Sequence, residues 1–158
     1  EVAVIGGGDA AVTEALVLAR TSGTVHVISR SPLRAKRVYA DRLDARANVR
    51  FHWGCEVTAI LGTDEVTGLA LRDVASGKTS ELACAGVFPF IGVEPVAGFL
   101  PAALLGADAR VQTDATLAST DPRIFAVGAA RAGYGGQAAQ AMAEGIGAAE
   151  AAARLVKA

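Results

Sequence analysis

A glycine-rich turn near the start of the chain is the clearest sign of chemistry in the sequence. It follows the apolar run 2–5 directly and consists of Gly6, Gly7, Gly8, Asp9, Ala10 and Ala11. Read as G-x-G-x-x-A, the first glycine allows a tight turn, the second lets the backbone approach a pyrophosphate, and the alanine keeps the next helix close to the sheet. The pyrophosphate would lie on the helix N-terminus, where free N–H groups converge. We therefore predict a dinucleotide site, the alternative being a strand-to-helix corner without a ligand.

The end of the second expected strand, 24–28, bears on which dinucleotide fits. NAD-binding folds usually place an acidic residue there, which accepts a hydrogen bond from the ribose 2′-hydroxyl. Here that place holds Ser29 and Arg30, and Arg34 follows shortly after. An acidic side chain would repel a 2′-phosphate, whereas two guanidinium groups can hold it in forked geometry. The residues favour NADP over NAD, and the alternative is that both arginines are solvated surface side chains.

The elements that must position these residues follow from the apolar spacing. Val12, Ala15, Leu16 and Ala19 recur at helical spacing and predict a helix over 9–21. We expect a strand over 49–53, a buried strand over 86–92 and a charged helix over 33–47, with short β-rich runs over 56–61, 66–72 and 79–82. A β-α-β-α-β unit, a β-meander and a returning strand predict a nucleotide-binding domain over residues 1–93.

Residues 94–158 have a different pattern. A loop-rich stretch precedes two short expected strands, 109–113 and 124–127, and an alanine-rich helix over 137–156 ends the chain. Two strands and one helix cannot bury their faces alone, so this segment needs a partner surface. Because the chain begins with Glu1 rather than methionine, we expect it to be part of a longer protein.

Composition limits the other functional classes. The 158 residues are 52% hydrophobic, and 15 basic and 16 acidic side chains give a net charge of -1, so no general attraction to nucleic acid or an anionic membrane is implied. No stretch is long and apolar enough to cross a membrane. Seven of the 15 basic residues fall between positions 30 and 50, and a solvated helix face accounts for most of them.

Neither the cysteines nor the histidines form a ligand pattern. Cys55 and Cys84 lie 29 positions apart without a C-x-x-C motif, and we expect buried thiols rather than a disulfide or redox pair. His26 and His52 each lie in an apolar strand pattern, so we interpret both as structural. We expect no metal site.

Several motifs in order resemble the thioredoxin reductase family of pyridine nucleotide–disulfide oxidoreductases, over essentially all 158 residues. These motifs are the glycine turn, Ser29-Arg30 through Arg34, the run 86–95 with Ile91 and Gly92, Thr113-Asp114, the run 124–128, and Gln137-Ala138. The resemblance implies an α/β fold class: a Rossmann-like three-layer nucleotide-binding domain with a β-meander, followed by a partial second FAD/NAD(P)-binding domain. Residues 1–93 would be the NAD(P)H-binding domain, and 94–158 the C-terminal return segment of the FAD-binding domain, whose N-terminal half would precede Glu1.

The resemblance also implies cofactors, partners and site residues. NADPH would pass hydride to FAD, and electrons would go on to a disulfide protein or a small-molecule acceptor, in a cytoplasmic homodimer. No side chain here would be a catalytic acid, base or nucleophile, because the cofactors carry the chemistry. Gly128 and its neighbour would lie on the flavin ribityl chain, and the backbone N–H groups of Gln137 and Ala138 on the flavin pyrimidine edge.

The chain departs from the family pattern in three places. A His-Arg-Arg run is replaced by Ser29-Arg30-Ser31, which removes one phosphate ligand. The late Gly-Asp appears as Gly128-Ala129, which removes a carboxylate acceptor, and Arg-Gln-Ala appears as Gly136-Gln137-Ala138. Two alternatives stay open. The first is a ferredoxin–NADP reductase-like enzyme or a dithiol oxidase, which lacks the redox C-x-x-C that a thioredoxin reductase has upstream of this region. The second is a non-catalytic nucleotide-binding sensor module.

Overall fold

A computed structural model describes residues 1–156 and divides the chain into two units, Glu1–Gly92 and Val93–Ala158. The first unit is built on a parallel sheet of order β3-β2-β1-β7. Its strands are β1 (Val2–Ile5), β2 (Val25–Ser29), β3 (Val49–Trp53) and β7 (Val87–Pro89). All three pairings are parallel. Every residue of β2 is buried, His26 and Ser29 included, as is usual for a strand covered on both faces.

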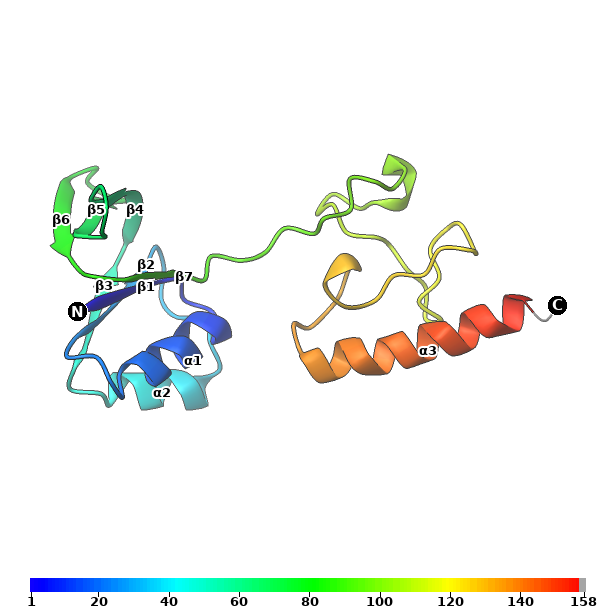
Figure 1. The fold of residues 1–158 in the computed structure, drawn as a ribbon, viewed down its shortest axis with the longest axis horizontal. Helices are drawn as coiled ribbons and strands as arrows, with labels where there is room; N and C mark the ends of the chain where they lie inside the picture. The colour runs from blue at the N-terminus through cyan, green and yellow to red at the C-terminus, as the bar shows by residue number, and fades with distance from the viewer. Residues whose placement is uncertain (157–158) are drawn as a thin grey trace. The chain divides into compact units, whose positions relative to one another are not determined.

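Two helices cover one face of this sheet, α1 (Asp9–Leu18) and α2 (Arg37–Asp44), and a second sheet covers the other (Figure 1). The second sheet is antiparallel, of order β4-β5-β6, with β4 (Cys55–Leu61), β5 (Gly68–Asp73) and β6 (Thr79–Ala83). Side chains alternate between the two faces of the parallel sheet. Val27 packs in the core beneath the helices, while Ile28 packs with Leu69 and Leu71 of the meander. The expected three-layer α/β fold is confirmed.

Two elements of the first unit are shorter than expected. The helix predicted over 33–47 spans only Arg37–Asp44 because the segment before it is an ordered loop that follows Pro32. The strand predicted as buried over 86–92 is limited to Val87–Pro89, and its residues are half-buried or exposed. This strand lies at the sheet edge, where a proline without an N–H group is tolerated.

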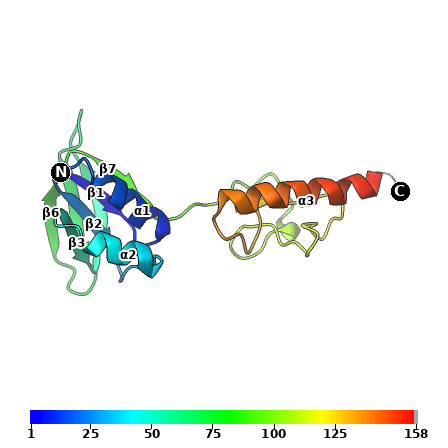
Figure 2. The ribbon, with the colours of Figure 1, turned by 90° about the horizontal axis from the view of Figure 1, so that it is seen from below.

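In the second unit the strands predicted over 109–113 and 124–127 are wrong. Both regions form isolated single-residue bridges instead, Val111 with Leu105 and Arg131, and Phe125 with Ala118. The regular elements are two short 3-10 turns, η1 (Ala102–Leu104) and η2 (Gly128–Ala130), and the long helix α3 (Ala138–Val156), which packs along the loops of this unit (Figure 2).

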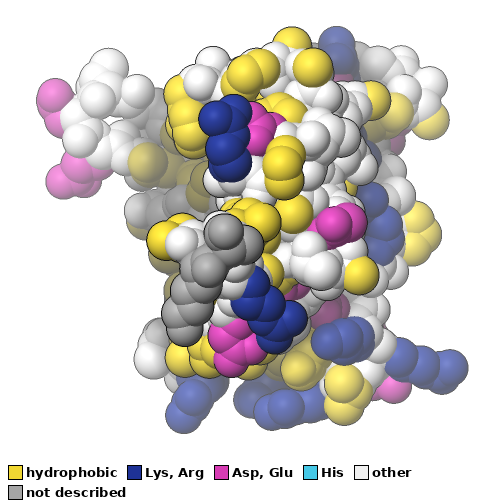
Figure 3. Space-filling view, turned by 90° about the vertical axis from the view of Figure 1, so that its right-hand side faces the viewer, with side chains coloured by type: hydrophobic (Ala, Val, Ile, Leu, Met, Phe, Trp, Pro, Cys, Tyr) yellow, Lys and Arg dark blue, Asp and Glu magenta, His cyan; other side chains and the backbone are white. Residues whose placement is uncertain are grey.

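Much apolar surface of the second unit is exposed. Val96, Phe99, Met142 and Ile146 are all at least 65% exposed, and Figure 3 shows hydrophobic side chains lying between charged ones on this part of the molecule. On α3, only Glu144 and Ala148 are buried. Across residues 1–156, no helix combines the length and apolar character needed to cross a membrane.

The two cysteines and the two histidines lie within the first unit, and the cysteines form no disulfide with each other. Both cysteines are free thiols, Cys84 buried and Cys55 half-buried, and burial raises the pKa of the Cys84 thiol. His26 Nδ1 lies 3.0 Å from His52 Nε2, and its Nε2 lies 3.1 Å from a Glu1 carboxylate oxygen. Within the described residues, no group of three His, Cys, Asp or Glu side chains has the arrangement to hold a metal ion.

Candidate functional site

The glycine turn connects β1 to α1 at the carboxyl edge of the parallel sheet. Gly6 donates its N–H to the carbonyl of Ile28, 2.9 Å away, and has a φ of 133°. A Cβ added to Gly6 would collide with the Phe90 carbonyl and lie 3.2 Å from the Cβ of Ala11. Only glycine therefore allows the end of β1, the segment after β7 and the start of α1 to approach one another at this point.

Gly8 has the opposite surroundings. It is the N-cap of α1, with φ −88° and ψ 178°, and no side chain caps this helix end. A Cβ on Gly8 would meet nothing within 4 Å. The N–H groups of the first turn, at Asp9, Ala10 and Ala11, have no carbonyl acceptor inside the helix. This uncapped N-terminus, open to solvent in front of Gly8, has the form of a phosphate-binding site.

The loop 30–36 is tethered to the same turn. The backbone N–H groups of Arg34 and Ala35 both donate to the Gly7 carbonyl, at 2.7 and 3.1 Å. The Lys36 N–H donates to the Asp9 carboxylate at 2.7 Å. The predicted site residue Asp9 thus anchors this loop rather than capping its own helix. As a result, the loop that carries the two arginines lies beside the start of α1.

Arg30 and Arg34 extend from this loop as exposed side chains. None of the ion pairs among residues 1–156 engages either guanidinium group. The Ser29 hydroxyl donates to the Ser31 carbonyl at 2.7 Å, and a Cβ on Gly7 would lie 2.8 Å from the Ser29 oxygen. Ser29 therefore shapes the loop, and the two arginines remain free to meet an anion.

The segment after β7 completes this edge. Phe90 donates its N–H to the Ile5 carbonyl at 2.7 Å, which holds the segment beside the end of β1. Ile91 is 79% exposed, and Gly92 has a φ of 114°. Since β2 and β7 lie on opposite sides of β1, the glycine turn lies at the point where the strand order reverses. In open α/β sheets ligands bind at such a switch point.

The predicted site residues of the second unit lie around the turn η2. Gly128 is buried with a φ of 59°, whereas Ala129 is exposed. Gln137 and Ala138, at the start of α3, are also exposed. The Gln137 carbonyl accepts hydrogen bonds from the Tyr134 hydroxyl at 2.8 Å and from the Ala141 N–H at 3.2 Å.

Sequence reasoning missed a buried carboxylate behind this turn. Glu144 is 9% exposed and accepts hydrogen bonds from the Gly128 N–H at 2.8 Å, from Gln140 at 2.7 Å, and from the Arg131 guanidinium. The hydrogen bond from Arg131 is the main cause that lowers the pKa of Glu144 to about 2, against its ordinary 4.5. The one sequence signal at this place is a charged residue at 144, four positions after Gln140 in an Ala- and Gly-rich helix, and it does not reveal the partners Gly128 and Arg131.

Comparison with known proteins identifies the family. The sequence profile described as "Pyridine nucleotide-disulphide oxidoreductase" matches residues 1–145. The chain belongs to this family.

Several thioredoxin reductases are similar to the chain. The chain is 39% identical to the thioredoxin reductase of Treponema pallidum over 156 residues, which are 98% of this chain and 51% of that protein. It is 41% identical to the Streptomyces clavuligerus thioredoxin reductase over 96 residues, 60% of this chain and 30% of that protein. The crystal structure of Lactococcus lactis thioredoxin reductase superposes with a TM-score of 0.91 at 32% identity, covering 98% of this chain and 52% of that one.

The coverage values show how much of each relative the chain matches. The chain spans about half the length of the Treponema and Lactococcus thioredoxin reductases. The sequence-based resemblance to a thioredoxin reductase-like member of the family is confirmed.

Proposed function

We propose that residues 1–93 form the NADPH-binding domain of a thioredoxin reductase-like flavoenzyme, and that residues 94–158 form the C-terminal part of its FAD-binding domain. The observation that carries this proposal is the uncapped start of α1, with open space in front of Gly8 and two unpaired arginines on a loop tethered beside it. Similarity to thioredoxin reductases along nearly the whole chain supports the rest.

In this proposal each part of the turn has its own role. The N–H groups of residues 8–11 bind the pyrophosphate, with Gly6 and Gly7 shaping the turn. Arg30 and Arg34 bind the 2′-phosphate. Ser29 occupies the position where an acidic residue would repel that phosphate. Ile91 and Gly92 border the nicotinamide end.

The second unit would contribute one side of a flavin site. Gly128 and Ala129 would lie along the ribityl chain, and Gln137 and Ala138 would present the N-terminus of α3 to the pyrimidine edge. Bound together, FAD and NADPH supply hydride transfer and two-electron storage, and the protein supplies their positions. In the longer protein we expect an N-terminal half of the flavin domain, a homodimer, a cytoplasmic location, and a disulfide protein or small molecule as electron acceptor.

A nucleotide titration tests the proposal. Calorimetry with NADP and NAD should show tighter binding of NADP to the wild-type chain, and the preference should disappear in Arg30→Ala/Arg34→Ala. A lost charge-assisted phosphate contact costs about 1.5–3 kcal/mol, or about tenfold to a hundredfold in affinity. Arg50→Ala/Arg123→Ala, which removes two exposed arginines elsewhere, is the control. Equal affinity of the wild type for both nucleotides would refute the assignment of the arginines.

One residue favours a second candidate, a nucleotide-binding sensor module without flavin. Ala129 supplies a methyl group where the family pattern has a carboxylate acceptor. A flavin absorption spectrum in a longer protein containing this chain would exclude the sensor. A C-x-x-C upstream would separate a thioredoxin reductase from a ferredoxin–NADP reductase-like enzyme or a dithiol oxidase.

A further inference from the structure

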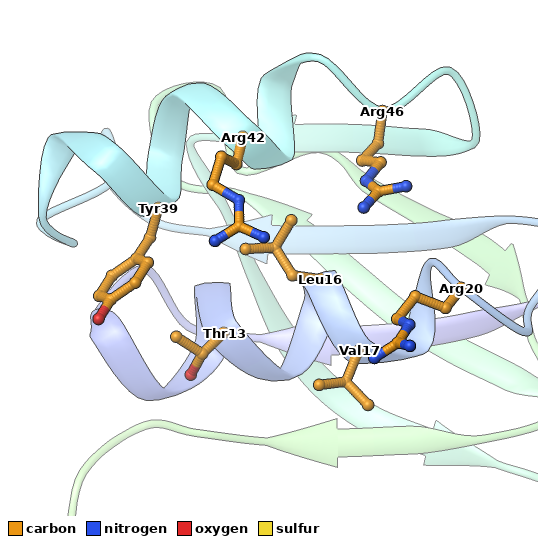
Figure 4. Close-up of a pocket in the computed structure, with 7 residues that line it drawn as sticks. All are labelled: Thr13, Leu16, Val17, Arg20, Tyr39, Arg42 and Arg46. Carbon is orange, nitrogen blue, oxygen red and sulfur yellow. The ribbon is translucent and has the colours of Figure 1, made fainter.

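A groove between α1 and α2 lies apart from the glycine turn and has no role in the function proposed above. Figure 4 shows Arg42 and Arg46 extending from the α2 side toward α1, and Arg20 lying at the end of α1. Leu16 and Tyr39 also line the groove. Part of the arginine-rich segment that the sequence singles out therefore has a defined place in the fold.

The groove collects positive charge without a matching acid. Three of its lining residues are arginines and none is acidic. Among residues 1–156, no ion pair or hydrogen bond engages the side chains of Arg20, Arg42 or Arg46. Neighbouring Arg37, by contrast, pairs with Asp41 on the outer side of α2. The three guanidinium groups therefore keep all their donors available.

The helix ends beside these arginines neutralise only part of this charge. Helices α1 and α2 end at Leu18 and Asp44, so Arg20 and Arg46 each lie just beyond a helix C-terminus. Each C-terminus carries a partial charge of about −0.5. Against three cations, about two positive charges remain in the groove. In a chain with a net charge of -1 this is a local excess.

The floor of the groove strengthens electrostatic binding. Leu16 is buried and Tyr39 half-buried, so one side of the space is closed to water. The groove has a volume of about 450 Å³, within the range of small-ligand sites. Guanidinium groups bind phosphate oxygens in pairs through their forked N–H groups, and they do so more strongly where water is partly excluded. Arg42 on α2 and Arg46 just beyond its C-terminus both line the groove, so two phosphate groups of one ligand could each meet a guanidinium group.

We propose that this groove is a second anion site, which binds a compact ligand bearing two or more phosphate groups. Arg42 on α2 and Arg46 just after it hold the phosphates, and Arg20, just after α1, closes the site. The site is separate from the proposed nucleotide site, whose arginines lie on the loop before α2 and are tethered to the glycine turn. Occupation of one site does not require the other.

Calorimetric titration of the full chain with inorganic pyrophosphate tests this proposal. Because the glycine turn is itself proposed to bind a pyrophosphate, we expect Gly8→Val, which fills that position, to keep one site of wild-type affinity. Binding there should be about tenfold weaker in each of Arg20→Gln, Arg42→Gln and Arg46→Gln, and about a hundredfold weaker or more in the triple variant. The matched control is Arg37→Gln/Arg50→Gln/Arg123→Gln, which changes the net charge equally and should keep wild-type affinity. Arg30→Gln/Arg34→Gln should also keep it, which separates this site from the nucleotide site.

Four outcomes would overturn the proposal. These are no pyrophosphate binding to Gly8→Val at millimolar concentration, equal losses in both triple variants, loss only in Arg30→Gln/Arg34→Gln, and binding of a decaglutamate peptide but not of pyrophosphate. The last would point to an acidic polypeptide partner instead. Circular dichroism checks that the variants fold, and the single variants provide the comparison if the triple variant does not.

Discussion

Gly6 and Gly8 belong to one turn but have different surroundings. At Gly6 the backbone is in a left-handed conformation and a side chain would strike the Phe90 carbonyl, so the requirement comes from folding. At Gly8 the backbone is extended and nothing lies within 4 Å of an added Cβ. A requirement for glycine at Gly8 would therefore come from a ligand rather than from the fold.

Replacing Gly8 by valine tests this distinction. We expect Gly8→Val to reduce NADP affinity by about a hundredfold or more, because the side chain fills the space proposed for the pyrophosphate, while the unfolding midpoint stays near wild type. Gly23→Val is the control, since Gly23 also has open space around its Cβ but lies outside the turn. Binding is measured by calorimetry and unfolding by the fluorescence of Trp53, the one tryptophan of the sequence. Unchanged affinity in Gly8→Val would contradict the proposed site.

Glu144 gives a prediction about pH. Its folded-state pKa of about 2 lies below the ordinary 4.5, so in the acid range the unfolded chain binds the proton more readily than the folded one. The stabilisation is complete above about pH 4.5 and is lost as the pH falls toward 2. We expect wild type to be more stable than Glu144→Gln near pH 7, with the difference shrinking near pH 3.

Hydrogen exchange of the α3 amides at the two pH values measures this difference. Glu150→Gln, which removes an exposed carboxylate from the same helix, is the control and should show no such change. A stability gap between wild type and Glu144→Gln that stays constant from pH 7 to 3 would contradict the role of the ionised carboxylate.

At the scale of elements, α2 depends on a single buried side chain. Leu43 is fully buried and is the only buried residue of this helix, whereas Val38 is 60% exposed. We expect Leu43→Ala to lower the free energy of unfolding by about 2–5 kcal/mol, and Val38→Ala to change it by less than about 0.5 kcal/mol. Urea titration followed by Trp53 fluorescence measures both. Similar midpoints for the two variants would show that α2 contributes little to the core.

The sequence predicts most elements of the first unit because their apolar residues recur at a clear period. The strands of the parallel sheet, α1 and the meander follow from such runs, and the glycine turn follows from its position between a strand and a helix. The start of α2 could not be predicted in this way, because the loop before it is fixed by hydrogen bonds to Gly7 and Asp9, residues distant in the sequence.

The second unit is harder to read from its sequence. Residues 109–113 and 124–127 have β-type composition, but a strand requires a neighbour along its length, and each finds only single-residue bridges. The Glu144 network likewise depends on groups that the fold brings together. These are the backbone N–H of Gly128 in η2, the Arg131 side chain just after η2, and Gln140 one turn earlier in α3. The spacing of apolar residues along the sequence indicates neither the missing strand partners nor the contacts of Glu144.

At the scale of the whole molecule, the proposed division of labour predicts no flavin binding by these 158 residues alone. Ala129 offers no carboxylate, and the second unit would line only one side of the cofactor. Calorimetric titration with FAD at micromolar concentration should show no binding. A stoichiometric flavin complex would show that the division at residues 93 and 94 is misplaced.

The exposed apolar side chains of α3 predict self-association. Met142 and Ile146 are 72% and 65% exposed and lie one helical turn apart, so pairing of two chains would remove both from water. We expect Met142→Glu/Ile146→Glu to shift the chain toward monomer in analytical ultracentrifugation without loss of helical signal. Ala139→Glu/Ala149→Glu, at two other exposed positions of α3, is the control for added charge. A wild-type chain that is already monomeric at high concentration would refute the prediction.

The tether between the loop 30–36 and the glycine turn bears on how coenzyme preference changes during evolution. Its three bonds use the backbone N–H groups of Arg34, Ala35 and Lys36, with acceptors on Gly7 and Asp9. Substitutions at 30, 31 and 34 would therefore leave the hydrogen bonds of the tether, and with them the path of the loop, in place. Selection can exchange basic for acidic residues there, one at a time, through folded intermediates. Asp9 is different, because its carboxylate holds the loop. A substitution there would disturb the path of the loop even if Asp9 does not touch the coenzyme.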